Sequence, residues 1–310
     1  MDALMQSILT AHFPGVGMGP ASTASGEVGR EPEASLPAGA ISRSLPFSEY
    51  LRLEGVNWSS LKHMARSPKH YQFERTPPPS ETRAMVKGRA AHTAILEPEQ
   101  YPLEYVVFPG PRRAGKEWDQ FETQNMDRTI LTRSEDGLAV AMRDAIRGHP
   151  VADALLSGGL AEQVIEWVDP ETGLLCKARL DYLRPDALVD LKTTADLDPH
   201  RFPALVYRMG YHGQLAFYLR GLKALGLDDH PAHLVAVESA APHDVAAFAV
   251  EPGAITVGDE LVSRLLDRLA ECQATGEWPG RYPGESVLTI PSWAFVEGEE
   301  LGITINGEAA

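Results

Sequence analysis

The sequence predicts an α/β fold in which helices flank a central mixed β-sheet. Three strand-like runs of apolar residues, 164–168, 174–183 and 188–193, follow one another with only short turn-forming segments between them. Such runs are typical of an antiparallel meander. Segments with helical spacing precede and follow the meander, so helices are available to cover both faces of the sheet.

One large domain with an appendage at each end is expected. A length of 310 residues allows one or two domains. Residues 1–45 are rich in Gly, Pro, Ala and Ser and show no sustained periodicity, which predicts a flexible leader. We therefore expect the folded domain at residues 46–296 and a C-terminal tail at 297–310.

Helices are expected first, with order beginning near Asn57. Asn57 opens an apolar pattern that predicts a helix to residue 66, and Ser67-Pro68 are typical of the cap and first position of the next helix. Over residues 85–95 one stripe of apolar side chains, with His92 on it, recurs every three or four positions. This spacing predicts a helix from which His92 points inward.

The region before the meander is predicted to hold one strand and two helices. Residues 104–108 have the composition of a strand, and residues 116–126 have helical spacing. Thr132 and Glu135 form a capping-box pattern, which predicts a helix that ends before Pro150.

Helices and strands alternate after the meander. A helix is expected to begin at Asp198-Pro199, and another to span residues 211–225. Two strands, at 233–238 and 245–251, precede a long helix that ends at Gly276.

The composition excludes several classes of protein. Hydrophobic residues make up 44% and charged residues 23% of the chain, which excludes a wholly disordered, collagen-like or coiled-coil protein. No apolar run is long enough to span a membrane and no secretory signal opens the sequence, so a soluble intracellular protein without membrane contacts is expected. The two cysteines are too few for a disulfide framework, a four-cysteine zinc site or an iron–sulfur cluster.

Charge is distributed unevenly along the chain. The formal net charge of -15 argues at first against binding to nucleic acid. However, 15 acidic residues and only three arginines follow residue 227, whereas residues 57–89 hold seven Lys and Arg against two Glu. This asymmetry predicts one face for a polyanion, with Arg66 and Lys69 on it, and one solvated acidic face. An exposed helix with clustered basic residues is the alternative.

The strongest chemical signal is a pair of aspartates in the meander. If Pro185-Asp186 are the central residues of a tight turn, Asp181 lies directly opposite Asp190, and Arg179 opposite Lys192. Two facing carboxylates require a cation, and Mg²⁺ prefers oxygen ligands of this kind. Lys192, about 7 Å along the strand, could hold a water molecule or a scissile phosphate beside the metal.

Each of these residues also has a simpler interpretation. The aspartates could pair with Arg179 and Lys192 on an exposed strand face. The apolar neighbours of Asp190 favour a buried strand instead, where an unpaired charge costs several kcal/mol. His92, taken alone, is more typical of a hydrogen-bonded core histidine than of a metal ligand.

Four motifs, in this order, resemble those of the RecB-like branch of the PD-(D/E)XK nucleases: GxxxH at Gly88–His92, Asp181, DxK at Asp190–Lys192 and QxxxY at Gln214–Tyr218. Within that branch, residues 57–293 are similar to the RecE-type exonuclease domain (exodeoxyribonuclease VIII). Further matching positions are Ser67-Pro68 with Tyr71, Gly115-Lys116 with Trp118, His149-Pro150, Cys176-Lys177 and Trp278-Pro279-Gly280.

The resemblance implies a PD-(D/E)XK nuclease core that uses Mg²⁺, with Mn²⁺ as a substitute, and neither a nucleotide nor an iron–sulfur cluster. It implies that Asp181 and Asp190 are catalytic metal ligands, together with His92 and the backbone carbonyl of Leu191. Lys192 would be the catalytic lysine.

The resemblance also extends to residues around this set. Gln214, Tyr218 and Arg89 would lie on the substrate side. Glu162 lies where relatives often carry a helper glutamate, which would add a metal ligand. Its alternation with apolar neighbours is also the pattern of an ordinary exposed strand face.

The implied activity is an ATP-independent exonuclease that degrades one strand of duplex DNA from its ends, 5′ to 3′. The product would carry 3′ single-stranded overhangs for recombination by annealing. Such proteins work with a RecT-like single-strand annealing protein, often form ring-shaped homo-oligomers, and are common in phages and prophages. The bacterial or phage-infected cytoplasm is the expected location. A structure-specific endonuclease on the same core and a non-catalytic DNA-binding or assembly protein are the alternatives.

A phosphate-loop pattern, GxxxxGK, occurs at residues 110–116. Glu117 replaces the Ser or Thr that would bind Mg²⁺, so nucleotide binding is not expected. Contacts from Arg112, Arg113 and Lys116 to DNA phosphates are expected instead.

Overall fold

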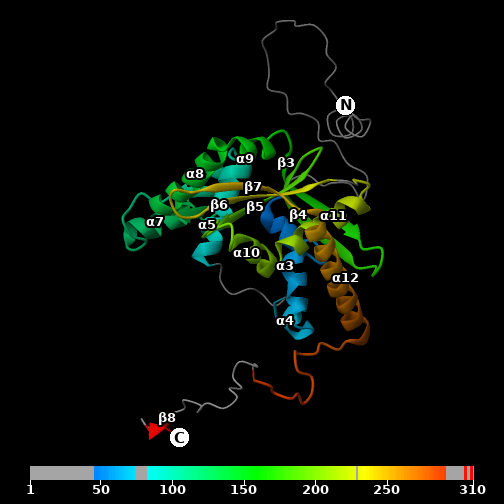
Figure 1. Ribbon diagram of the computed structural model, residues 1–310. Coiled ribbons are helices and arrows are strands. Elements are labelled where there is room, and N and C mark those ends of the chain that lie inside the picture. The colour runs from blue at the N-terminus through cyan, green and yellow to red at the C-terminus, as the bar shows by residue number, and fades with distance from the viewer. Residues whose placement is uncertain (1–44, 75–81, 228–229, 291–303, 306–307, 310) are drawn as a thin grey trace, which may run out of the picture.

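The computed structural model describes residues 45–74, 82–227, 230–290, 304–305 and 308–309. Nearly all of the predicted leader lies outside these residues, as does most of the predicted tail. A five-stranded mixed sheet with helices on both faces forms the centre (Figure 1), which confirms the predicted α/β class. The sheet contains β3 (Leu160–Val168), β4 (Leu175–Leu183), β5 (Leu188–Thr194), β6 (Ala232–Glu238) and β7 (Val245–Ala249), in that order.

The first three strands form the predicted antiparallel meander, and β5 and β6 are parallel. Strand β7 closes the sheet antiparallel to β6. The chain between β5 and β6 forms helices α10 (Phe202–Met209) and α11 (Tyr211–Ala224). A parallel pair requires such a crossover, because its second strand begins at the far end of the sheet.

The N-terminal part of the domain is helical. It contains α2 (Phe47–Arg52), α3 (Trp58–Leu61), the 3₁₀ helix η1 (Lys62–Ala65), α4 (Pro68–Glu74) and α5 (Arg83–Leu96). Asn57 caps α3, since its Oδ1 accepts a hydrogen bond from the Ser60 amide at 2.9 Å. The expectation that order begins near Asn57 is wrong, because α2 precedes it. Six residues are too few to show a helical period, and tertiary contacts hold α2: Lys177 Nζ donates to the carbonyls of Tyr50 and Leu53 at 2.9 and 2.6 Å.

Two short parallel strands and four helices lie between α5 and β3. They are α6 (Tyr101–Glu104), β1 (Tyr105–Val107), α7 (Lys116–Gln124), β2 (Thr129–Leu131), α8 (Arg133–Gly148) and α9 (Pro150–Leu155). The capping box is confirmed: Thr132 Oγ1 accepts from the Glu135 amide at 3.2 Å, and Glu135 Oε2 accepts from the Thr132 amide at 2.9 Å.

Helices cover the two faces of the sheet in different ways (Figure 1). α11 packs on β3 and β4 and is covered by α12 (Pro252–Thr275), whereas α5 and α8 contact β5 and β6 from the other face. Gly258 lets α12 approach α11 closely, since a Cβ there would lie 2.4 Å from the His212 carbonyl oxygen. Each face has its own cluster of buried apolar side chains. A separate pair of short strands, β8 (Thr304–Ile305) and β9 (Glu308–Ala309), completes the described elements.

One predicted helix start is wrong. α10 begins at Phe202 and not at Asp198-Pro199. The Asp198 carboxylate accepts hydrogen bonds from the amides of His200 and Arg201, at 2.9 and 3.1 Å, and so stabilises a turn before the helix. Among the described helices, none combines the length and apolar character needed to cross a membrane.

The β4–β5 turn has the predicted register for only two residue pairs. The Arg184 amide donates to the Ala187 carbonyl at 2.8 Å, and Tyr182 pairs with Val189 as expected. Beyond this point the strands diverge, so Asp181 and Asp190 do not form a ladder pair, nor do Arg179 and Lys192. The direct pairing was derived from an ideal ladder, but Asp181 Oδ2 instead accepts a hydrogen bond from the Leu191 amide at 2.8 Å. The two carboxylates therefore lie at a fork between the strands.

Candidate metal centre and active site

A pocket of about 520 Å³ opens at the fork between β4 and β5. Helices α2, α3, α5 and α11 contribute to its wall. Many of the residues singled out in the sequence line it: Arg89, His92, Glu162, Asp181, Lys192, Gln214 and Tyr218. The fold thus brings together residues that are more than 120 positions apart in the sequence.

Three side chains in this pocket form a possible metal-binding group. One ligand atom each from His92, Glu162 and Asp181 lies within 4.8 Å of the others, and no other such group occurs in the described part of the chain. The three residues come from α5, β3 and β4, so the main helix and sheet layers fix their positions.

Glu162 is an integral part of this group. Its residue is only 7% exposed, so the interpretation as an exposed strand face is wrong. Its φ of 52° lies in the left-handed region, which is unfavourable for a glutamate in a strand. The side chain is also held by Arg179, whose Nε lies 2.8 Å from Glu162 Oε2.

Asp190 lies beside the group and is 1% exposed. Its Oδ2 forms an ion pair with Lys192 Nζ, whereas its Oδ1 has no hydrogen-bond partner among the described residues. A buried carboxylate oxygen without a partner is costly, so this position favours a bound cation or a strong donor. The alternative of an exposed, solvated Asp190 is therefore wrong.

The donor set fits a hard divalent cation. Carboxylate oxygens and a neutral imidazole are both ligands of divalent metal ions, and Asp190 Oδ1 is an unused acceptor next to them. The Leu191 carbonyl, also predicted as a ligand, accepts from Lys192 Nζ at 3.5 Å. The structure brings all five predicted ligands to one fork.

Burial dominates the electrostatics of the group. Burial and the nearby Asp181 raise the pKa of Glu162 to about 8, and burial raises the pKa of Asp190 to about 6. Burial and the charge of Lys192 lower the pKa of His92 to about 4, which keeps the imidazole in the neutral form that binds metals. A bound metal ion would compensate the negative charge of the clustered carboxylates. It would also find His92 in the neutral form that binds metals.

Lys192 remains protonated in this environment. Burial opposes its charge, but Asp190 and Asp181 outweigh that effect and raise its pKa. Its ammonium also lies over the Tyr211 ring, 4.9 Å from the centroid. The strand and these contacts place a permanent positive charge at the edge of the carboxylate group.

Gln214 and Tyr218, which the sequence predicts on the substrate side, line the same pocket. Both lie on α11, and Gln214 Nε2 donates to the Tyr218 hydroxyl at 2.7 Å. Burial and the neighbouring Asp181 and Asp190 raise the pKa of Tyr218 well above its ordinary value, so the hydroxyl stays protonated. On the opposite wall, Arg89 lies over the Phe47 ring at 5.9 Å.

The remaining predicted DNA-binding residues lie outside this pocket. Arg66 and Lys69 are exposed, just after η1 and on α4. Arg112 is exposed in the loop before α7, and Lys116 is exposed as the first residue of α7. Arg113 donates to the Ile130 carbonyl at 2.6 Å and pairs with Glu135 at 3.2 Å. Because its guanidinium is bound within the fold, we do not include Arg113 in the proposed DNA-binding face.

Several residues of the pocket, among them Lys62 and Tyr211, were not assigned to the site from the sequence. Lys62 lies close enough to Lys192 that burial and this second positive charge lower its pKa. Tyr211 supports Lys192 from below its ammonium. Tyr211 could have been found, since it lies three residues before Gln214 and thus on the same helix face. No sequence pattern linked Lys62 to the site.

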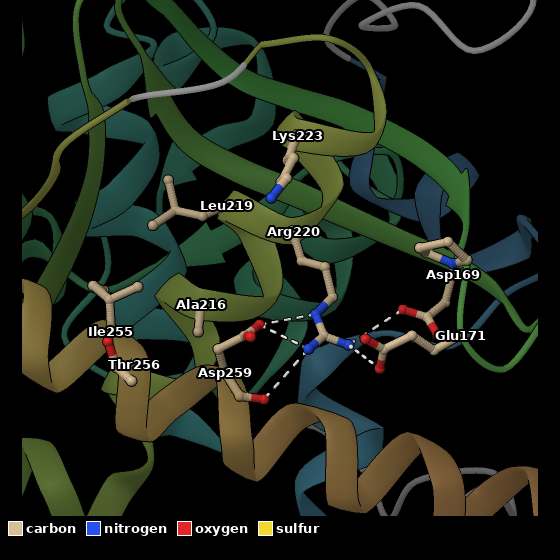
Figure 2. A pocket seen from close by; sticks show the side chains of 10 residues that line it. Asp169, Glu171, Ala216, Leu219, Arg220, Lys223, Ile255, Thr256 and Asp259 are labelled. Carbon is tan, nitrogen blue, oxygen red and sulfur yellow. Dashed lines mark hydrogen bonds and ion pairs between the residues drawn. The ribbon is translucent and has the colours of Figure 1, made fainter.

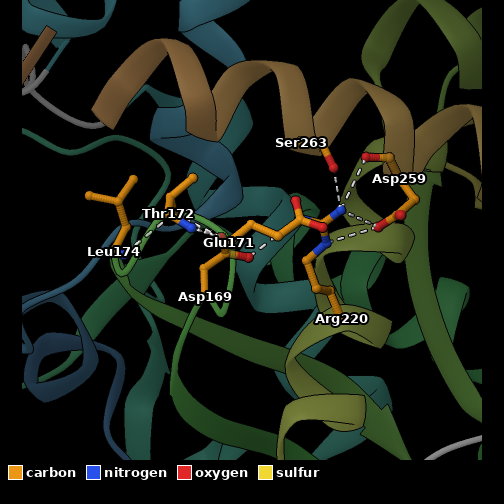
Figure 3. A network of polar contacts seen from close by, with 7 residues as sticks. All are labelled: Asp169, Glu171, Thr172, Leu174, Arg220, Asp259 and Ser263. Carbon is orange, nitrogen blue, oxygen red and sulfur yellow. Dashed lines mark hydrogen bonds and ion pairs between the residues drawn. The ribbon is translucent and has the colours of Figure 1, made fainter. Parts of the chain in front are cut away.

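A second charged pocket, of about 430 Å³, lies between α11, α12 and the β3–β4 turn (Figure 2). Arg220 is at its centre and contacts Asp169, Glu171 and Asp259, with N···O distances of 3.3, 3.7 and 2.8 Å. Ser263 accepts a further hydrogen bond from Arg220 (Figure 3). These contacts tie three elements together.

Comparison with known proteins gives a family and a fold. Residues 57–286 match the family described as "PDDEXK-like domain of unknown function (DUF3799)". The fold is similar to a crystal structure from Eubacterium rectale described as a "Putative exonuclease", with a TM-score of 0.56 and 17% sequence identity over 79% of this chain and 93% of that chain. No curated protein matches the sequence.

Proposed function

The chain belongs to this PDDEXK-like family, and from that premise we propose that it is a metal-dependent nuclease that hydrolyses phosphodiester bonds in DNA. The observation that supports this most strongly is the fork between β4 and β5. There, His92, Glu162 and Asp181 converge beside a buried Asp190 oxygen that has no partner among the described residues. Phosphodiester hydrolysis needs a cation at the phosphate and an activated water molecule, and such a site supplies the ligands for both.

The residues of the fork would have different roles in the hydrolysis. His92, Glu162, Asp181 and Asp190 would hold the metal, with the Leu191 carbonyl as a further ligand. A divalent ion bound there lowers the pKa of a coordinated water molecule and neutralises phosphate charge. Lys192 would donate hydrogen bonds to the attacking water or to a phosphate oxygen, which requires the protonated form that Asp190 and Asp181 favour.

The neighbouring helix would position the DNA. Gln214 and Tyr218 present an amide and a protonated hydroxyl from α11, and Arg89 and Lys62 add positive charge at the pocket wall. These groups donate hydrogen bonds, as contacts to phosphate oxygens require.

The motif order supports a more specific proposal. We infer a RecE-type exonuclease that uses Mg²⁺, starts at duplex ends, degrades one strand 5′ to 3′ and leaves 3′ overhangs for recombination. A RecT-like annealing protein and a ring-shaped homo-oligomer are the partners that this proposal includes. The similarity in fold to the Eubacterium rectale protein is consistent with it.

The test uses linear duplexes labelled separately at each 5′ end, together with closed circular DNA. The full-length protein is incubated with Mg²⁺ and without ATP, beside an Asp190→Ala control and an EDTA control. Metal-dependent loss of the linear DNA with circles intact is the expected result. Early release of each 5′ label as a mononucleotide or short oligonucleotide would indicate 5′ to 3′ degradation, whereas a ladder of shortened strands that keep the 5′ label would indicate 3′ to 5′ degradation. Nicked circles would indicate an endonuclease instead. Intact DNA of both kinds with well-folded protein would contradict the nuclease and favour a binding or assembly protein.

A further inference from the structure

A basic groove of about 460 Å³ adjoins the active-site pocket. Helices α3, η1, α10 and α12 form it, and it shares Trp58, Lys62 and Met209 with the pocket at the fork. The same helices lie together on one side of the sheet in Figure 1. A ligand that leaves the pocket at Lys62 would therefore enter the groove directly.

Positive charge lines the groove, and Glu74, which is not itself a lining residue, contacts His63 at 3.9 Å and acts on Lys62. Lys62, Arg66, Arg208 and Arg264 line it, and no Asp or Glu is among the described lining residues. Arg66, Arg208 and Arg264 are exposed and form no ion pair with a described residue. The nearest contrast is the Arg220 pocket on the other side of α12, where three carboxylates surround one guanidinium.

The floor and rim of the groove are apolar and aromatic. Trp58 and Leu265 are buried in the floor, whereas Tyr207, Met209 and Val257 are 70%, 43% and 48% exposed. The Tyr207 ring stacks on His212 with centroids 5.2 Å apart, so it is held while one face stays accessible. Basic side chains beside exposed rings are the combination that binds single-stranded nucleic acid, through phosphates and base stacking together.

We propose that this groove binds single-stranded DNA at the point where it joins the active site. The proposal rests on the proposed function and adds the path of one strand: phosphates contact Arg208 and Arg264, and a base stacks on Tyr207. Duplex DNA would use the groove less, because its bases are already stacked on one another and do not offer a free face to Tyr207.

The test compares binding of a 5′-fluorescein-labelled oligo-dT 15-mer and of a blunt duplex, by fluorescence anisotropy in Ca²⁺ buffer. The Arg208→Glu/Arg264→Glu variant is expected to bind the 15-mer about tenfold or more weakly and to lower its salt slope by about 0.7 per lost contact. Duplex affinity should change by less than about threefold. The matched control, Arg143→Glu/Lys223→Glu, carries the same change in charge on α8 and the far end of α11 and should bind like the wild type.

The aromatic contact is tested separately. Tyr207→Ala is expected to weaken binding of the 15-mer about five- to tenfold, whereas Tyr207→Phe should retain it, because stacking requires the ring and not the hydroxyl. Equal losses for the 15-mer and the duplex, or no loss for either, would overturn the proposal.

The proposed function has its own readout. Metal-dependent hydrolysis of bis(4-nitrophenyl) phosphate requires only the site at the fork. The groove variants should hydrolyse it at the wild-type rate. Normal hydrolysis together with unchanged 15-mer binding would therefore reject single-strand binding in the groove but not the proposed function. Absence of hydrolysis in the wild-type protein would reject the proposed function instead.

Discussion

Two charged pockets lie on different faces of α11, and they differ in how their buried charges are paired. In the Arg220 pocket, one guanidinium contacts three carboxylates and a serine hydroxyl, and the fully buried Asp169 also accepts from the Thr172 amide and hydroxyl. At the fork between β4 and β5, acidic groups converge and one oxygen of the buried Asp190 has no partner among the described residues.

The difference indicates what each pocket is for. Matched buried charges add little net stability but hold elements in one arrangement, and breaking one partner is costly. Unmatched charges remain in a fold only where a ligand completes them, and strongly shifted pKa values at a cleft mark such places. This contrast supports a structural role for the Arg220 pocket and the proposed role of the fork as the site for a metal and its substrate.

The largest expected effect comes from Asp190. Asp190→Ala should reduce DNA cleavage by about 10³-fold or more, because it removes the carboxylate with the unused oxygen. The variant should melt at a lower temperature, because the buried Lys192 loses its ion-pair partner, so cleavage is measured below the melting temperature. Cleavage rates and thermal melting of the purified variant measure the two effects. Retained cleavage would place the active site elsewhere.

Lys192 should affect turnover more than metal affinity. Lys192→Ala is expected to lower kcat by about 10²- to 10³-fold, because an ammonium that stabilises the transition state is lost. Mn²⁺ affinity should be unchanged or higher, since a positive charge beside the ligands is removed. Isothermal titration with Mn²⁺ and steady-state kinetics separate these quantities. A large loss of metal affinity with normal kcat would remove the catalytic role of Lys192.

The Arg220 pocket should respond in stability and not in activity. Asp169→Asn is expected to lower the free energy of unfolding by about 2–3 kcal/mol, because a buried charged acceptor of three groups becomes neutral. Activity per folded molecule should stay near the wild-type value. Urea denaturation and a cleavage assay at low temperature measure both. Loss of activity without loss of stability would indicate that the Arg220 pocket serves activity, as the fork does, and not stability.

The smallest effect is expected for cations on the surface near the basic groove. Arg66→Glu with Lys69→Glu should weaken DNA binding severalfold. The slope of log affinity against log salt concentration should become less steep by about 1 per lost phosphate contact. Lys223→Glu, at the Arg220 pocket, serves as a control that should change neither quantity. Salt titrations of affinity measure the slope, and an unchanged slope in the double variant would move the DNA-binding face elsewhere.

Local patterns in the sequence predicted much of the fold. The Thr132–Glu135 capping box and the Pro185-Asp186 turn are decided by neighbouring residues, and both occur as predicted. Helix α2 was missed because Lys177, more than 120 residues away, binds its carbonyls. The start of α10 was placed too early because Asp198 can cap a turn as readily as a helix.

The site was predicted by residue type and order more than by geometry. An ideal ladder placed Asp181 opposite Asp190. In the structure the strands diverge there, and the Asp181 carboxylate accepts a hydrogen bond from the Leu191 amide. Glu162 has an alternating sequence pattern, and only its left-handed backbone and its burial show that it faces the cluster. Lys62 reaches the pocket through the packing of α3 on α11, which no local pattern encodes.

The unmatched carboxylates at the fork are proposed to bind a divalent metal. Titration of Mn²⁺ into the full-length wild type, Asp181→Asn and Asp169→Asn, followed by calorimetry, tests this binding most directly. We predict a single site in the wild type and in Asp169→Asn, and affinity at least about tenfold weaker in Asp181→Asn. Equal Mn²⁺ affinity in all three proteins, or no binding by the wild type, would show that the fork does not bind the metal.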